Sequence, residues 1–171
     1  MQIYKPSLPI IKRLDGFTLI ELIIVLVILG IITLVISFSF PSGDTYAYAQ
    51  AQQLANDLRY MQNLAVTRES PVRINFAASQ YSLTETDGTT AINHPGSNSN
   101  VILMPTSVTL STINLPNNYV VFGSNGEPYS STSISSSALT GYAWVLITGQ
   151  SHIAVVLMTP ETGAILNPII F

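Results

Sequence analysis

The feature that most constrains the fold is a run of 22 residues without charge, from Leu22 to Gly43. A helix that spans a membrane needs about 20 apolar residues, each rising about 1.5 Å. The apolar region of a secretory signal peptide is shorter, at roughly 7–15 residues, and a small-residue cleavage site follows it. Here the run is too long for that, and no Ala-x-Ala pattern follows it at the usual place. The sequence therefore predicts a transmembrane helix over residues 17–40 that the mature protein retains.

One acidic residue, Glu21, stands directly before the uncharged run. A carboxylate inside a membrane helix costs roughly 2.5–3.5 kcal/mol on insertion scales, and by default it marks a functional site with a partner. The alternative is an acid that is tolerated near the membrane interface or neutralised by protonation. The role of Glu21 therefore depends on the group with which it pairs.

The charges of the chain are divided by the apolar run. Residues 1–16 carry a net charge of +2, so the whole-chain charge of −3 leaves −5 for residues 17–171. Basic residues before a membrane helix remain on the cytoplasmic side. The charge pattern thus predicts a cytoplasmic N-terminus and a C-terminal body on the far side of the membrane.

Helical patterning continues beyond the apolar run and predicts an amphipathic helix over residues 41–70. Pro71 bounds its end. Residues 17–69 are expected to form one helix of about 80 Å with a kink at Pro41. The expected core-facing residues are Ala51, Leu54, Ala55, Leu58, Met61, Leu64 and Ala65. The expected polar face holds Gln52, Gln53, Asn56, Asp57, Arg59 and Asn63.

After Pro71 the pattern changes to a period of two residues, which predicts strands. Asp87-Gly88 is a turn signal, and residues 88–100 and 130–137 read as loops. The predicted fold class is α+β, with a long N-terminal helix on an antiparallel β-rich body of residues 71–171. The expected strands lie at residues 72–76, 81–84, 101–104, 107–113, 119–122, 142–148, 152–158 and 164–170.

The residue types that carry catalysis or hold metals do not cluster in this sequence. Cysteine is absent, so disulfides and thiolate metal sites are excluded. His94 and His152 lack spaced partner ligands and are expected to make ordinary hydrogen bonds. No Gly-x-Ser-x-Gly motif or nucleophile–base set stands out. Asp87-Gly88 is more typical of a turn than of a calcium site. We therefore expect neither an enzyme nor a bound cofactor or metal.

Two further observations concern the β-rich body. The last basic residue is Arg73, so no cation follows it up to Phe171. Phosphate backbones are bound by several cations, so the body is not expected to bind nucleic acid. Aromatic residues recur at strand-like spacing and are expected in the core rather than on a binding surface. They are Tyr119, Phe122, Tyr142 and Trp144.

The string Gly16-Phe17-Thr18-Leu19-Ile20-Glu21 closely resembles the class III signal of type IV prepilins and type II secretion pseudopilins. The resemblance implies a pilin-like fold for the α+β chain, and it implies that residues 1–16 are a leader peptide. It implies that a prepilin peptidase cuts between Gly16 and Phe17 and then N-methylates Phe17. It also implies that Glu21 pairs with the free amino terminus of a neighbouring subunit during assembly.

A second resemblance lies at residues 49–72, which look like the helix-to-first-strand segment of H-type (GspH/FimT-like) pseudopilins and minor pilins. Val121-Phe122 before Asn125-Gly126, and the turn at residues 160–163, also look like that group. The resemblance implies a minor pseudopilin of type II secretion, assembled into a periplasmic pseudopilus that drives protein export. A minor type IV pilin and a membrane-anchored periplasmic binding protein or enzyme are the alternatives.

The location and partners follow from the same resemblance. The protein is expected to cross the bacterial inner membrane once, with residues 17–40 as anchor and filament-core helix and the body in the periplasm. Its expected partners are other pilin-like subunits, the prepilin peptidase/methyltransferase and an inner-membrane assembly platform.

Overall fold

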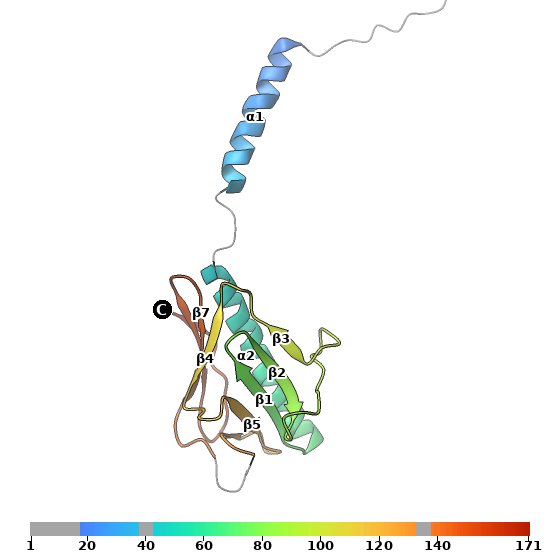
Figure 1. Cartoon of the computed structure of the whole chain (residues 1–171), viewed down its shortest axis with the longest axis vertical. Coiled ribbons are helices and arrows are strands. Elements are labelled where there is room, and N and C mark those ends of the chain that lie inside the picture. Colours follow the sequence, from blue (N-terminus) through green and yellow to red (C-terminus); the bar gives the residue numbers. More distant parts are fainter. Residues whose placement is uncertain (1–17, 38–42, 133–137) are drawn as a thin grey trace, which may run out of the picture. The chain divides into compact units, whose positions relative to one another are not determined.

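The computed structural model describes residues 18–37, 43–132 and 138–171. The chain divides into two compact units, Met1–Phe40 and Pro41–Phe171. Helix α1 (Leu19–Ser37) belongs to the first unit, and helix α2 (Gly43–Arg68) with all the strands belongs to the second (Figure 1). The kink expected at Pro41 falls outside the described residues.

Apart from Glu21, Thr33 and Ser37, helix α1 consists of apolar residues and one glycine. Its side chains from Leu19 to Thr33 are all exposed within this chain. Thr33 donates its hydroxyl hydrogen bond to the carbonyl oxygen of Leu29 at 2.7 Å, which keeps this polar group satisfied inside the helix. Among the described residues, no helix combines the length and the hydropathy that crossing a membrane requires.

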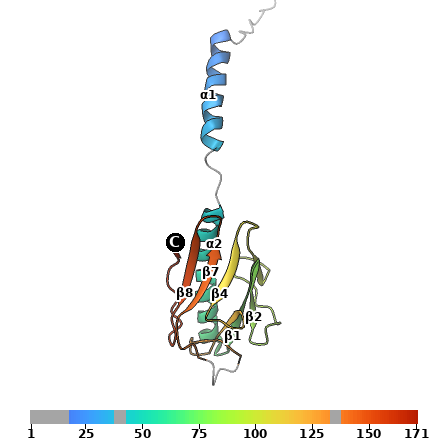
Figure 2. The same cartoon turned by 60° about the vertical axis from the view of Figure 1, so that its left-hand side comes forward.

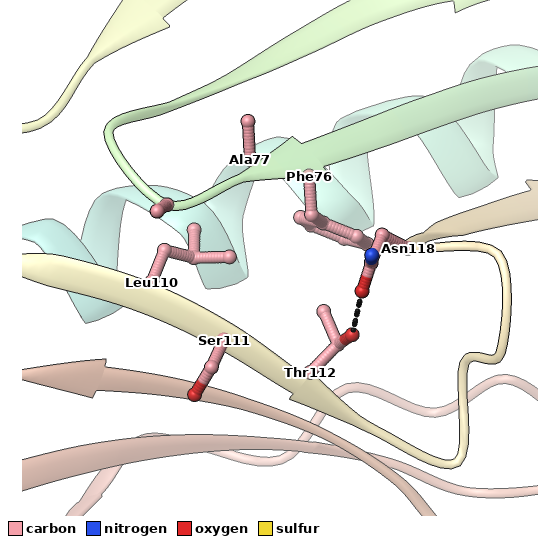
Figure 3. A pocket seen from close by; sticks show the side chains of 7 residues that line it. Phe76, Ala77, Leu110, Ser111, Thr112 and Asn118 are labelled. Carbon is pink, nitrogen blue, oxygen red and sulfur yellow. Dashed lines mark hydrogen bonds between the residues drawn. The ribbon is translucent and has the colours of Figure 1, made fainter.

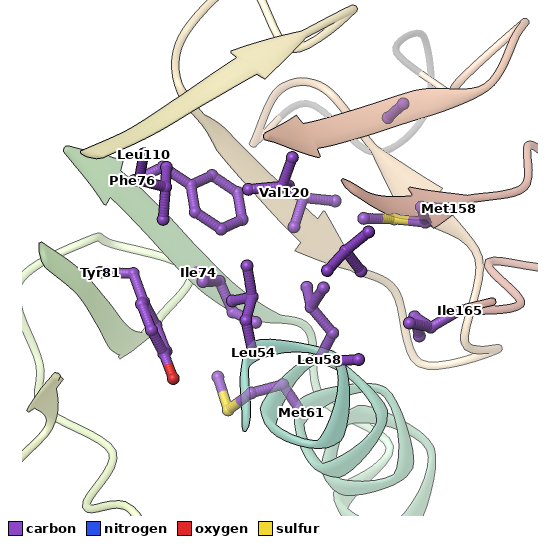
Figure 4. Close-up of a cluster of buried hydrophobic side chains, with 14 of the residues drawn as sticks. Leu54, Leu58, Met61, Ile74, Phe76, Tyr81, Leu110, Val120, Met158 and Ile165 are labelled. Carbon is purple, nitrogen blue, oxygen red and sulfur yellow. The ribbon is translucent and has the colours of Figure 1, made fainter. Parts of the chain in front are cut away.

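Helix α2 buries one stripe of side chains, as its periodicity predicts. Leu54, Leu58 and Met61 are fully buried and form one cluster with Ile74 of the neighbouring sheet (Figure 4). The small residues Ala47, Ala51, Ala55 and Ala65 complete the stripe. Small side chains along this face let the helix approach the strands closely.

The polar face of α2 differs from the prediction at one position. Asp57 is only 4% exposed, whereas Asn56 and Asn63 are exposed as expected. The prediction that Asp57 faces solvent was wrong. An acidic side chain can be buried when residues distant in the sequence supply its hydrogen bonds. Those partners are described with the candidate site.

The C-terminus of α2 is closed by a Schellman motif, with Glu69 in the left-handed conformation at φ 50°. The amide of Ser70 donates to the carbonyl of Ala65 at 3.2 Å, and the amide of Glu69 donates to that of Val66 at 3.3 Å. The helix thus ends at Arg68, three residues before Pro71.

The strands form two antiparallel sheets in the described part of the chain. The first has the order β3-β2-β1-β5-β6 and the second the order β4-β7-β8-β9. Figure 2 shows β4, β7 and β8 side by side with α2 behind them. The bounds are β1 Val72–Ala77, β2 Gln80–Glu85, β3 Val101–Leu103, β4 Thr109–Ile113, β5 Tyr119–Phe122, β6 Pro128–Tyr129, β7 Ala143–Thr148, β8 Ile153–Met158 and β9 Ile169–Ile170.

Helix α2 packs against strands of both sheets, so one core serves the whole body. The sheets meet where the amide of Leu110 in β4 donates to the carbonyl of Ala78 after β1, at 2.9 Å. The predicted α+β arrangement of a helix on an antiparallel β-rich body is thereby confirmed.

Two of the four aromatic residues expected in the core lie elsewhere. Phe122 is buried and Tyr119 half-buried, but Tyr142 is 54% exposed and Trp144 38% exposed. In β7 the buried residues alternate with Trp144, because α2 covers the face of Ala143 and Val145. The outer face of the second sheet therefore carries Trp144 beside Ile113 and Leu157, its partners in register.

The turns and short strands show where local patterns reach their limit. Asp87-Gly88 forms the predicted turn, with Gly88 at φ 76° and its amide bonded to the carbonyl of Glu85 at 3.0 Å. The strand expected at residues 164–170 is reduced to β9 and a single bridge between Met158 and Ile165. Strand β6 was not predicted, because two residues that begin with a proline carry no periodic signal.

Candidate functional site

Glu21 lies in the first turn of α1, two residues after the helix begins. Its backbone amide donates to the Thr18 side-chain hydroxyl at 3.3 Å and to the Thr18 carbonyl at 3.1 Å, so Thr18 caps the helix. Thr18-x-x-Glu21 has the sequence of a capping box, and an acid in this turn also favours the helix dipole. Within the described residues, Glu21 forms no ion pair. Gly16 and Phe17 lie outside those residues.

The most buried polar cluster of the body centres on Asp57. The Tyr81 hydroxyl donates to Oδ2 of Asp57 at 2.5 Å, and Nε2 of His94 lies 2.7 Å from Oδ1. The pKa of the Tyr81 hydroxyl is raised well above its ordinary value, mainly by burial and secondly by the hydrogen bond to Asp57. The hydroxyl therefore keeps its proton and remains a donor. The cluster joins α2, β2 and the loop after β2, and both carboxyl oxygens are satisfied.

A second aspartate–histidine pair holds the start of α2. Oδ1 of Asp44 accepts the backbone amides of Ser151 and His152 at 2.8 and 2.9 Å, and Oδ2 lies 3.1 Å from Nδ1 of His152. These contacts lower the pKa of Asp44 to about 2, and the hydrogen bond from the Ser151 amide contributes most to this shift. Asp44 thus anchors the turn between β7 and β8 on the first turn of α2. Both histidines make hydrogen bonds, as the sequence predicts.

Two longer side chains of α2 hold the C-terminal segments of the body. Arg59 donates to the carbonyl of Ile165 at 3.0 Å and to the side chain of Asn167 at 2.9 Å. Gln62 donates to the carbonyls of Gly126 and Thr162, both at 2.9 Å. The helix therefore fixes turns that are 64 to 108 residues away in the sequence.

A cavity of about 270 Å³ opens between β1 and β4 (Figure 3). Leu110 and Phe76 line it beside Thr112, whose hydroxyl donates to Oδ1 of Asn118 at 2.7 Å. Its lining holds no acid, base or thiol. In the described part of the chain, no three acidic, histidine or cysteine side chains gather as a metal site. Asp87 directs its carboxylate to Thr89 and Thr90 of its own turn.

In the part of the body that the structure describes, the main polar contacts radiate from helix α2. The family model described as "Type II transport protein GspH" matches residues 50–158, which begin in α2 and end with β8. The chain belongs to the GspH family. A second model, the prokaryotic N-terminal methylation motif, matches residues 12–37. This GspH-family chain is accordingly a pseudopilin of the type II transport group, as the sequence resemblance implied.

A solved structure of low sequence identity confirms the pilin-like fold that the resemblance implied. The minor pseudopilin EpsH from the type 2 secretion system of Vibrio cholerae has a TM-score of 0.53 and 12% identity. The match covers 70% of this chain and 94% of that one. The type IV minor pilin FimU of Pseudomonas aeruginosa has a TM-score of 0.47 and 13% identity, over 70% and 85% of the two chains. No similar sequence is found among the curated proteins.

The sequence alone did not reveal the two aspartates that organise this GspH-family body. Asp57 meets Tyr81 and His94, which lie 24 and 37 residues further along the chain. Asp44 meets His152 across 108 residues. The only local signal was the position of Asp57 within the apolar stripe, between Leu54 and Leu58.

Proposed function

We propose that this chain is a minor pseudopilin that is cut after Gly16, methylated at Phe17 and assembled into a periplasmic pseudopilus that drives protein export. The observation that carries the proposal is the pair of family matches on one chain. The methylation motif covers residues 12–37, which include the cleavage position and Glu21, and the GspH model covers the body.

The leader and the apolar run give the N-terminal segment two successive roles. Before assembly, residues 17–40 hold the subunit in the inner membrane, with the basic leader in the cytoplasm. After cleavage and extraction, the same apolar surface packs against other subunits in the filament core. The exposure of every side chain from Leu19 to Thr33 is what a helix whose partners are other molecules requires.

In this proposal Glu21 sets the axial position of each subunit relative to its neighbour in the filament. Cleavage after Gly16 creates a cationic amino terminus, and a neighbour's terminus placed at Glu21 offsets the cost of burying its carboxylate. Only one axial stagger satisfies both charges. The absence of an ion pair for Glu21 among the described residues fits an intermolecular partner.

The prepilin peptidase/methyltransferase and the inner-membrane assembly platform are the partners that this route requires. The body, in contrast, faces the periplasm and meets other pilin-like subunits. Its polar clusters at Asp57 and Asp44 are satisfied within the chain, so they serve its shape rather than a reaction.

Mass spectrometry of the mature protein tests the proposal directly. We expect an N-terminus at Phe17 that carries one added methyl group. Gly16→Val is the matched variant, because a side chain at the cleavage position obstructs the peptidase. It should retain the leader and the Met1 terminus. An unmodified Met1 terminus in the unaltered protein would instead indicate a simple membrane-anchored periplasmic protein.

A further inference from the structure

Arg73 on β1 stands apart from the other cations of the body. Arg68 pairs with Glu85 at 3.2 Å, and Arg59 donates to neutral oxygens of the C-terminal segment. Among the described residues, none forms an ion pair with Arg73 or accepts a hydrogen bond from its guanidinium. This is an unpaired cation on a body that is otherwise acidic.

The guanidinium of Arg73 lies against two neighbouring groups of the body. Its Cζ lies 3.7 Å from the centre of the Tyr119 ring. A Cβ added to Gly88 would lie 2.6 Å from Nη1 and 2.8 Å from Cζ, so the backbone of Gly88 also lies against the group. Since the ring and this backbone cannot share one face, the guanidinium is held between them. A cation–π contact of this kind is worth about 0.5–1 kcal/mol at exposed sites.

The acids nearest to Gly88 in the sequence are committed elsewhere. Glu85 pairs with Arg68, and the carboxylate of Asp87 accepts four hydrogen bonds from Thr89 and Thr90. Nε of Arg73 is buried without an acceptor, which leaves the two Nη groups as the donors that a partner can reach. The body therefore orients this cation, and none of the residues that the structure describes supplies an anion for it.

We propose that Arg73, held between Tyr119 and Gly88, docks an acidic side chain of a neighbouring subunit in the filament. A planar guanidinium binds a carboxylate through two parallel hydrogen bonds, and orientation in advance lowers the entropy lost on binding. Arginine and tyrosine are also enriched among the residues that dominate protein interfaces. The proposal rests on the filament-subunit function proposed above.

Charge complementarity selects a protein carboxylate over a polyanion. Binding to nucleic acid or to an anionic lipid surface is built from several cations, whereas Arg73 is isolated within an acidic body. Its neighbours on the same face of β1 and β2 include the neutral, polar residues Asn75, Ser82 and Thr84. Asn75 donates to the hydroxyls of Ser82 and Thr84 at 3.3 and 3.1 Å, which resembles the polar rim of a protein interface.

The experiment places a photo-crosslinking residue at Ser82 of the full-length protein, in cells that assemble the filament. Ser82 lies on the same sheet face as Arg73, because β1 and β2 pair Arg73 with Thr84 and Asn75 with Ser82. We expect a crosslink to a pilin-like subunit, close to an aspartate or glutamate. Arg73→Gln should lower its yield about tenfold, as loss of a contact worth about 1.4 kcal/mol would.

Matched variants separate docking from folding. Arg68→Gln removes one positive charge from the same body and should leave the crosslink unchanged. If Arg73→Gln does not fold, Arg73→Lys keeps the charge without the planar fork and should give an intermediate yield. Arg73→Glu combined with lysine at the crosslinked acid should restore the yield, which a purely structural role of Arg73 would not.

Three results would overturn the inference about Arg73, and a fourth would count against the proposed function instead. An unchanged crosslink in folded Arg73→Gln, a crosslink far from any acid, or binding of a 30-mer DNA duplex or anionic vesicles that depends on Arg73 would each contradict it. Failure of the unaltered protein to carry a methylated Phe17 or to enter the filament would instead count against the proposed function.

Discussion

Tyr81 donates its hydroxyl hydrogen bond to Oδ2 of Asp57 and thereby joins strand β2 to helix α2 inside the core. The second oxygen of Asp57 meets His94 from the loop that follows β2. Three segments of the body thus converge on one carboxyl group that is 4% exposed. A polar group buried in this way is tolerated only while its hydrogen bonds are kept.

Tyr81→Phe is therefore expected to destabilise the body by about 1–3 kcal/mol, because Oδ2 of Asp57 stays buried without a donor. The measurement is urea unfolding of residues 41–171, which form one compact unit with a core of their own. Tyr142→Phe is the control, since Tyr142 is 54% exposed. The control should change the unfolding free energy by no more than about 0.5 kcal/mol. Equal stabilities of the two variants would contradict the role given to Asp57.

Asp44, which pairs with His152, should make the stability of the body depend on pH. The folded pKa of Asp44, about 2, lies below the ordinary value of 3.8, so its stabilising contribution is complete above that value. The contribution disappears as the pH falls from about 4 toward about 2. Asp44→Asn should accordingly lower the urea midpoint at neutral pH and converge with the unaltered protein near pH 2.

Convergence is the informative part of that measurement, because Asp87 and Glu127 also have lowered pKa values. Their effects are common to both proteins and cancel in the difference. Glu161→Gln on the exposed turn serves as the control and should give a small offset at every pH. A constant offset for Asp44→Asn from neutral pH down to about 2 would show that its hydrogen bonds contribute through some other route.

The sequence predicted the elements of this fold better than it predicted their faces. The stripe from Leu54 to Met61 is local, so its period reveals both the helix and its buried side. Trp144 alternates correctly within β7, but alternation cannot say which face α2 covers. Asp57 was assigned to the solvent-facing side because helical periodicity places an acidic residue on the polar face. Its hydrogen-bond partners lie on another strand and a loop, so the local sequence does not reveal them. Nothing near Arg73 in the sequence indicates that the turn at Gly88 folds over it.

Glu69 offers a stabilising change at the end of α2. A side chain in the left-handed conformation is strained by contact of its Cβ with the backbone, and glycine is the usual residue at this position of a Schellman motif. Glu69→Gly should stabilise the body by about 0.5–1 kcal/mol. Glu69→Ala keeps the Cβ and should show no comparable gain. Equal midpoints of the glycine and alanine variants would argue against strain at this residue.

At Gly163, in the turn that Gln62 contacts, a substitution should destabilise the body. Its φ is 63°, and an added Cβ would lie 2.8 Å from both the Gln62 side-chain nitrogen and the Gly126 carbonyl oxygen. Gly163→Ala should therefore cost roughly 1–3 kcal/mol of stability through backbone strain and the displaced hydrogen bond. Gly96→Ala meets only ordinary contacts and is the control. A stable Gly163→Ala protein would indicate that the turn shifts freely.

Glu21 combines a possible capping role with the proposed pairing role, and two substitutions separate them. Glutamine also serves at the third position of a capping box, so Glu21→Gln preserves the cap while removing the charge. Thr18→Ala weakens the cap by about 1 kcal/mol and leaves the charge. Breaking a buried ion pair by removing one partner costs about 3–5 kcal/mol, so pairing predicts that Glu21→Gln is the more damaging change.

The readout is incorporation of the subunit into the filament, measured beside its amount in the membrane fraction. Glu21→Gln and Glu21→Leu should insert into the membrane normally and enter the filament poorly, whereas Thr18→Ala should enter it almost as well as the unaltered subunit. Normal incorporation of Glu21→Gln together with a defect in Thr18→Ala would reverse the assignment. Glu21 would then serve its own helix, and the register of the filament would have to come from another contact.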